Sequence, residues 1–241
     1  MIIKVCGMRD AQNIREVAEL DIDMMGFNFW PESKRFVNMI SSQAGIVPDY
    51  SRERLYEMAR QGSSRQYAFP NRIKRVGVFV DEMPQTIVTR VYNYSLDYIQ
   101  LHGDESPVLI DNLRSTLVPD IVPDIKFIKA FGISTADDFR QCDAFEGKAD
   151  LLLFDYKTEG RGGSGKHFDW SLLDAYHGTT PFLLSGGIGP DDAEELLRIK
   201  HPRFAGVDVN SRFETAPAMK DVGKLRNFVE RIRHHNTIEN Q

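Results

Sequence analysis

Short runs of apolar residues alternate along the chain with segments in which apolar residues recur at helical spacing. The apolar runs are continuous rather than alternating with polar residues, which is typical of parallel strands covered on both faces. Eight such runs are present: Ile2–Cys6, Met24–Phe29, Arg75–Val80, Tyr98–Leu101, Phe127–Ala130, Leu151–Phe154, Phe182–Ser185 and Phe204–Val209. Helical patterns follow several of them, over Asp10–Leu20, Pro84–Tyr94, Asp191–Ile199 and Lys220–Arg233.

This repetition predicts an α/β protein with the fold of a (β/α)8 TIM barrel, formed by residues 1–241 as a single domain. An open doubly wound sheet of five or six strands is the alternative, and the number of runs favours the barrel. Two segments depart from the repeat. Residues 48–74 are long and polar and predict a helix followed by a surface insertion at about 62–72, and residues 234–241 are expected to fray.

Composition narrows the possible partners. Hydrophobic residues make up 41% of the chain and the net charge is −5 without a long basic run, which disfavours nucleic acid. No stretch is long and apolar enough to span a membrane, and the first residues lack the layout of a signal peptide. Cys6 and Cys142 have neither metal-ligand spacing nor a disulfide framework, so we expect a reduced, cytoplasmic protein, as a monomer or a homodimer.

The carboxyl ends of the predicted strands carry the candidate chemistry, because working residues of a barrel lie there. Asp155 directly follows the apolar run Leu151–Phe154, so partial desolvation should raise the pKa of its carboxyl, as a general acid requires. Cys6 ends the first run and could act as a base or nucleophile. The alternative for Cys6 is a small buried hydrophobic residue, the commoner fate of a free cysteine.

Polar residues at two further strand ends could contact a ligand. Arg35 follows the second run and could bind a carboxylate through two parallel hydrogen bonds, although a solvated loop arginine is the simpler interpretation. Gln100 and His102 lie two residues apart and therefore on one face of the fourth strand, with Leu101 on the other. If that face lines the barrel interior, both contribute to a pocket; otherwise His102 is a core histidine.

Glycine-rich loops follow the last strands. The segment Gly160–Lys166 nearly matches a P-loop, but His167 stands where a serine or threonine would hold magnesium, so we exclude nucleotide hydrolysis. Backbone N–H groups of that loop remain available to an anion. Gly186 and Gly187 follow the seventh run, in a region where barrels often bind phosphate. The eighth run leads through Asp208 into further polar residues, Asn210 and Ser211.

Taken in order and spacing, these residues closely resemble the phosphoribosylanthranilate isomerase family over nearly the whole chain. The residues that carry the resemblance are Lys4-Val5-Cys6-Gly7, Gly26-Phe27, Ser33-Lys34-Arg35, Arg75–Val80, Gln100–Gly103, Lys129-Ala130, Gly162–Lys166, Phe168–Trp170 and Leu184–Gly187. The resemblance implies a (β/α)8 enzyme of tryptophan biosynthesis. Its reaction is an Amadori rearrangement of N-(5′-phosphoribosyl)anthranilate, which needs neither a metal nor a cofactor.

The resemblance also implies roles for the candidate residues. Cys6 would be the general base, Asp155 the general acid, and Arg35 the residue that holds the anthranilate carboxylate. The remaining substrate contacts would come from Gln100, His102 and Asp208. The phosphate would be bound by residues of the loops after strands six, seven and eight: Gly163, Ser164, Gly165, Gly186, Gly187, Asn210 and Ser211.

One departure and three alternatives remain. Arg212 stands where the family usually has a small residue, which leaves open whether it contacts phosphate. The related isomerase of histidine biosynthesis typically uses two aspartates, and Cys6 disfavours it. A ribulose-phosphate epimerase would need metal ligands, of which His102 alone is well placed. A non-catalytic binder of a phosphorylated metabolite is disfavoured by the presence of both Cys6 and Asp155.

Overall fold

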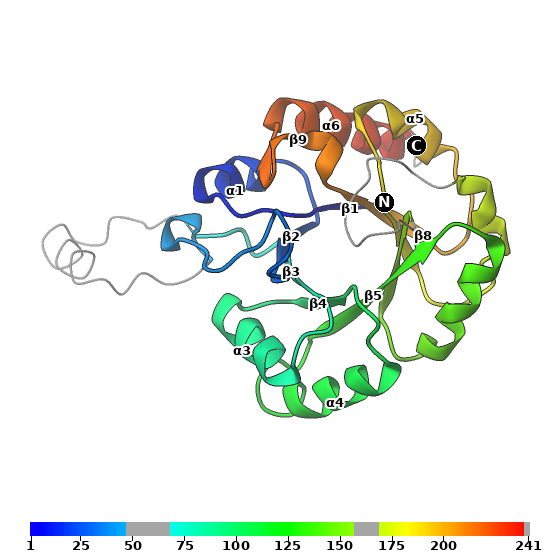
Figure 1. Cartoon of the computed structure of the whole chain (residues 1–241). Coiled ribbons are helices and arrows are strands. Elements are labelled where there is room, and N and C mark those ends of the chain that lie inside the picture. The colour runs from blue at the N-terminus through cyan, green and yellow to red at the C-terminus, as the bar shows by residue number, and fades with distance from the viewer. Residues whose placement is uncertain (47–67, 157–168, 239–241) are drawn as a thin grey trace, which may run out of the picture.

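The computed structural model describes residues 1–46, 68–156 and 169–238, and within them eight parallel strands close into a barrel in chain order (Figure 1). The strands are β1 (Ile2–Val5), β2 (Met24–Asn28), β3 (Lys74–Phe79), β4 (Tyr98–Leu101), β5 (Lys126–Ile133), β6 (Leu151–Tyr156), β7 (Phe182–Leu184) and β8 (Phe204–Val209). β1 pairs with both β2 and β8, which closes the ring. The predicted barrel is confirmed, and the alternative open sheet is wrong.

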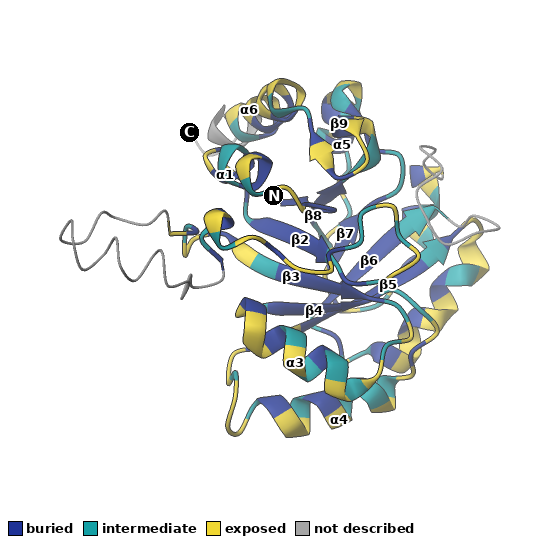
Figure 2. Cartoon of the chain, turned by 60° about the vertical axis from the view of Figure 1, so that its left-hand side comes forward, coloured by how far each residue is buried: buried dark blue, intermediate teal, exposed yellow. Residues whose placement is uncertain are grey.

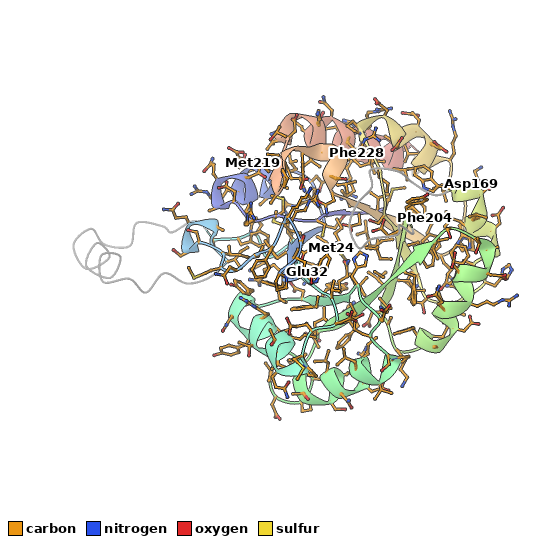
Figure 3. All side chains as sticks on the ribbon, viewed as in Figure 1. Met24, Glu32, Asp169, Phe204, Met219 and Phe228 are labelled. Atoms are coloured by element: carbon orange, nitrogen blue, oxygen red, sulfur yellow. The ribbon has the colours of Figure 1, made fainter. Side chains whose placement is uncertain are left out.

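Alternating side chains along each strand divide the apolar core into two layers. The inner layer fills the barrel with the side chains of Met24, Val76, Tyr98, Ile128, Ala130, Leu151, Leu153 and Leu183. A larger outer layer joins the strands to the surrounding helices, including Phe228 of α6 (Val222–Ile238). Figure 3 shows Met24 within the ring of strands and Phe228 in the helical layer around it. Because this inner layer is apolar, a polar residue on the inner face of a strand is a candidate for the functional site.

Helices and short 3-10 turns cover the outside of the barrel, with their exposed faces toward solvent (Figure 2). The α-helices before α6 are α1 (Ala11–Ala18), α3 (Pro84–Tyr94), α4 (Pro107–Leu117) and α5 (Ala193–Leu197). The 3-10 helices are η1 (Ser42–Ala44), η2 (Ala136–Phe145), η3 (Trp170–Ala175), η4 (Pro190–Asp192) and η5 (Ser211–Phe213). Asp10 caps α1, and prolines begin α3 and α4, where a missing N–H costs nothing. No helix in the described part of the chain is long and apolar enough to cross a membrane.

The end of the chain differs from its sequence pattern. Lys220, which we expected to begin the closing helix, instead belongs to a small antiparallel hairpin of β9 (Glu214–Ala216) and β10 (Met219–Lys220). Side-chain bonds of Lys220 to Asn210 and Glu214 hold it there, and α6 begins only at Val222. α6 then continues to Ile238, so the tail that we expected to fray from residue 234 begins as helix.

Most of the expected surface insertion, residues 62–67, lies outside the described residues, but its last part belongs to the body of the protein. Phe69 is buried in the outer core. Arg72 donates hydrogen bonds to the carbonyl oxygens of Ala18, Leu20 and Ile22. Phe69 and the guanidinium of Arg72 therefore anchor this segment to the barrel, because the arginine satisfies carbonyls at the end of α1 and before β2.

Candidate active site

A cavity of about 600 Å³ opens at the carboxyl ends of the strands. Every candidate site residue within the described part of the chain lines it: Cys6, Arg35, Gln100, His102, Asp155, Gly186, Gly187, Asp208, Asn210 and Ser211. Gly163, Ser164 and Gly165 lie outside the described residues. The barrel thus brings into one cavity residues that lie far apart in the sequence.

Asp155 lies near the end of β6, with its side chain on the inner face of the barrel. Its Oδ1 accepts a hydrogen bond of 2.7 Å from the Tyr156 N–H, and its Oδ2 lies 3.7 Å from Nε2 of His102. Burial raises the pKa of Asp155 to about 6, and the nearby charge of Asp208 adds to the effect. A carboxyl with this pKa can hold a proton close to neutral pH and deliver it.

Cys6 follows β1 and is buried in the same cavity. Its Sγ lies against Gly26 of β2, where a Cβ would come within 2.7 Å of the sulfur, so only glycine leaves the thiol its space. Burial raises the pKa of the Cys6 thiol, and the ammonium of Lys4 acts in the opposite direction. The free thiol is therefore protonated, and a positive charge beside it assists its ionisation.

Lys4 and Asp208 form an ion pair inside the barrel that sequence reasoning missed. Nζ of Lys4 donates a 2.8 Å hydrogen bond to Oδ1 of Asp208, and the lysine side chain has no exposed surface. Burial lowers the pKa of Lys4 and is the largest single effect, but the charges and hydrogen bonds of Asp208 and Cys6 together outweigh it, so the pKa of Lys4 is raised. The charges of Lys4 and Asp208 shift the pKa of both Cys6 and Asp155, so this ion pair couples electrostatically to both candidate catalytic groups. A lysine within the apolar run Ile2–Val5 was the signal in the sequence.

We expect Lys4→Met to lower the free energy of unfolding by about 3–5 kcal/mol, because it removes the hydrogen-bonded ion-pair partner of the buried Asp208 carboxylate. Urea denaturation at neutral pH measures the loss. Lys200→Met, which alters an exposed lysine, is the matched control and should change stability by less than about 0.5 kcal/mol. The double variant Lys4→Met/Asp208→Leu should recover most of the lost stability. Wild-type stability of the single variant Lys4→Met would contradict a buried ion pair between Lys4 and Asp208.

A second buried network surrounds Arg35. Its Nε and Nη2 donate to the two carboxylate oxygens of Glu214, at 2.8 and 2.6 Å. Lys220 donates to Oε1 of Glu214 at 2.6 Å and to Oδ1 of Asn210 at 2.7 Å. Glu214 and Lys220 were not among the candidate residues, because their place in the hairpin was not apparent from the helical pattern that begins at Lys220.

Gln100 offers an unused acceptor to the cavity. Its Nε2 lies 3.4 Å from Nδ1 of His102, whereas its buried Oε1 has no hydrogen-bond partner in the described part of the chain. A buried polar atom without a partner is costly, and a bound donor would relieve that cost. The side chain is almost completely buried, so its carbonyl is already oriented before a ligand arrives.

The loop after β7 crosses directly over Asp155. Gly186 and Gly187 have positive φ angles of 80° and 68°. A Cβ on Gly186 would lie 2.5 Å from Oδ1 of Asp155, so glycine is required for the close approach. The guanidinium of Arg212 packs over Gly189 in the same loop, where a Cβ would lie 3.3 Å from its Nε. The backbone of this loop and the carboxyl of Asp155 therefore reach the same ligand volume.

Within the described residues, no group of three histidine, cysteine, aspartate or glutamate side chains could hold a metal ion. The closed parallel barrel with its covering helices defines the class as a (β/α)8 protein. Its cavity holds a thiol, a carboxyl of raised pKa and a glycine loop, and the thiol and carboxyl equip it for proton transfer.

Comparisons with known proteins give the family. Residues 3–231 match the model of N-(5′-phosphoribosyl)anthranilate (PRA) isomerase. The chain is 45% identical to the N-(5′-phosphoribosyl)anthranilate isomerase of Parabacteroides distasonis, over 97% of this chain and 94% of that protein. The phosphoribosyl anthranilate isomerase of Thermotoga maritima superposes with a TM-score of 0.71 at 30% identity, covering 97% of this chain and all of that one.

A further solved isomerase, in complex with reduced 1-(o-carboxyphenylamino)-1-deoxyribulose 5-phosphate, superposes with a TM-score of 0.68 at 26% identity. The two chains are covered to 97% and 100%. The chain therefore belongs to the phosphoribosylanthranilate isomerase family, as its sequence motifs predict.

Proposed function

We propose that this protein converts N-(5′-phosphoribosyl)anthranilate to 1-(2-carboxyphenylamino)-1-deoxyribulose 5-phosphate, with Asp155 as the general acid and Cys6 as the general base. The observation that carries the proposal is that both groups line one cavity, where burial raises the pKa of Asp155 to about 6. Membership of the isomerase family supports the choice of substrate.

The rearrangement needs two proton transfers, and the cavity provides a group for each. Asp155 gives a proton to the furanose ring oxygen as the bond between that oxygen and C1′ breaks, which leaves an iminium ion at the anthranilate nitrogen. The Cys6 thiolate then takes the proton from C2′, and the electrons of that C–H bond neutralise the iminium to give an enolamine. Tautomerisation of the enolamine gives the ketone. Atoms and charge balance without an external oxidant or reductant.

The cavity lining also suggests how the substrate is held. The phosphate would lie against the loop of Gly186 and Gly187, together with Asn210, Ser211 and the residues Gly163, Ser164 and Gly165. Arg35 would bind the anthranilate carboxylate. The free Oε1 of Gln100 would accept a hydrogen bond from a sugar hydroxyl, with His102 and Asp208 nearby.

The direct test follows the fluorescence of the substrate, formed in place by mixing anthranilate with ribose 5-phosphate. We expect purified protein to remove the fluorescence at a rate proportional to its concentration, with the deoxyribulose product identified by mass spectrometry. A protein that binds the substrate without turnover would be a metabolite binder. Turnover of the aminoimidazole substrate of histidine biosynthesis alone would instead favour the alternative isomerase. Either result would overturn the proposal.

A further inference from the structure

Glu214 lies behind Arg35 and outside the cavity lining. Arg35 itself lines the cavity, together with Cys6 and Asn210, whereas Glu214 is not among the described residues that do so. Glu214 begins the hairpin strand β9, and its Oε1 also accepts the N–H of Ala218 at 3.1 Å, in the hairpin turn. The position of this carboxylate is therefore set by the hairpin rather than by a ligand.

The geometry of the Arg35–Glu214 pair decides which edge of the guanidinium is available. The hydrogen bonds from Nε and Nη2 occupy one side of the planar group. The two N–H groups of Nη1 and the second N–H of Nη2 are not engaged by Glu214. Gly7 lies against the side chain, where a Cβ would approach Cδ of Arg35 to 2.5 Å, so the arginine stem packs closely on the backbone beside Cys6.

The charges of this cluster match one anionic ligand group. Arg35 and Lys220 are the two cations of the cluster, and the carboxylate of Glu214 lies between them. Burial lowers the pKa of Lys220, and the charge and hydrogen bond of Glu214 oppose that shift. Burial favours protonation of Glu214, but hydrogen bonds from Arg35 and Lys220 hold its pKa below the ordinary value, so it is ionised. The cluster is therefore left with one positive charge, enough for a single carboxylate.

We propose that Glu214 is a positioning residue for substrate specificity: it fixes the guanidinium of Arg35 so that its free edge receives the aromatic carboxylate of the substrate. This inference rests on the proposed function, because it assigns a partner to the carboxylate of that substrate. A fixed planar fork loses little rotational freedom when it binds a carboxylate, which favours substrates that carry one. Glu214 acts through Arg35 and touches no reacting atom.

The test compares two substrates that differ only in the carboxylate. N-phosphoribosyl anthranilate and N-phosphoribosyl aniline are formed by condensing ribose 5-phosphate with the respective amine. In Glu214→Gln we expect KM for the anthranilate substrate to rise about tenfold, with kcat changed by less than about twofold. For the aniline substrate, or its inhibition constant where turnover is slow, we expect no change, because no carboxylate depends on Arg35.

Two controls separate positioning from a general loss of structure. Glu194→Gln makes the same chemical change in an arginine–glutamate pair on α5 and α6, at Arg231, and should leave both substrates unaffected. In an Arg35→Ala background, Glu214→Gln should have no further effect on KM. An equal change for both substrates, or none for either, would overturn the inference. Failure of the wild-type protein to convert the anthranilate substrate would overturn the proposed function itself.

Discussion

Asp155→Asn is expected to lower kcat by about 10²–10⁴-fold, the range that a positioned general acid contributes. The amide keeps the shape of the carboxyl and can still accept the hydrogen bond from the Tyr156 N–H. It cannot deliver a proton to the ring oxygen, so the furanose ring opens only at the rate that protonation by solvent allows. The measurement is single-turnover loss of substrate fluorescence at saturating protein.

The same substitution should stabilise the fold at neutral and alkaline pH. The pKa of Asp155 is raised from 3.8 to about 6 in the folded protein, so above pH 6 the folded state holds a poorly solvated carboxylate that unfolding would release. As pH falls from 6 to below 4 the group becomes protonated in both states and this cost disappears. We therefore expect Asp155→Asn to raise the free energy of unfolding by about 2 kcal/mol at pH 8, after allowance for partial exposure.

Urea denaturation of wild type and variant at pH 8, 6 and 4 tests that sign, because the difference should shrink toward zero at the lowest pH. Asp120→Asn, which changes an exposed carboxylate outside the cavity, is the control and should change neither kcat nor stability appreciably. A loss of stability at pH 8 would mean that the ionised carboxylate is held favourably. In that case Asp155 could not be a proton donor near neutral pH.

The sequence was a good guide to the barrel because each strand is buried on two faces. The run Tyr98–Leu101 and the helix Pro84–Tyr94 have the same bounds in the structure as in the sequence pattern. β5 extends from Lys126 to Ile133, beyond its predicted end at Ala130, because pairing with β6 continues through Gly132 and Ile133. Phe131 and Ile133 are apolar, so the apolar pattern itself extends past Ala130, and only Gly132 interrupts it.

The candidate site was predictable to the extent that its residues stand directly at strand ends. Cys6 ends an apolar run, and His102 and Asp155 each directly follow one, so the fold alone brings them together. Glu214 and Lys220 could not be found in this way, because they meet Arg35 through a short hairpin whose register depends on tertiary contacts. Arg35 and Glu214, which are hydrogen-bonded, lie 179 residues apart in the sequence, and no local pattern encodes a contact over that separation.

Cys6→Ser is expected to lower kcat by about 10²–10⁴-fold, because a hydroxyl ionises far less readily than a thiol and so supplies almost no base. Cys142→Ser is the matched control: Cys142 is also buried, but it lies in η2 outside the cavity lining. We expect that variant to keep the wild-type kcat per folded molecule. A Cys6→Ser enzyme with wild-type turnover would assign the removal of the C2′ proton to another group.

The pH dependence of the wild-type enzyme tests the same pair without mutation. Since burial raises the pKa of Cys6 and the pKa of Asp155 is about 6, the abundant form at neutral pH has a thiol and a carboxylate. The working form, a thiolate with a carboxylic acid, has the same net charge, so its fraction is constant between the two pKa values. We therefore expect kcat/KM to rise up to about pH 6 and then stay level until the thiol titrates. A decline in kcat/KM from pH 6 to 8 would show instead that the pKa of Cys6 lies below that of Asp155. In that order the working form is the abundant one near pH 6, and deprotonation of Asp155 removes it.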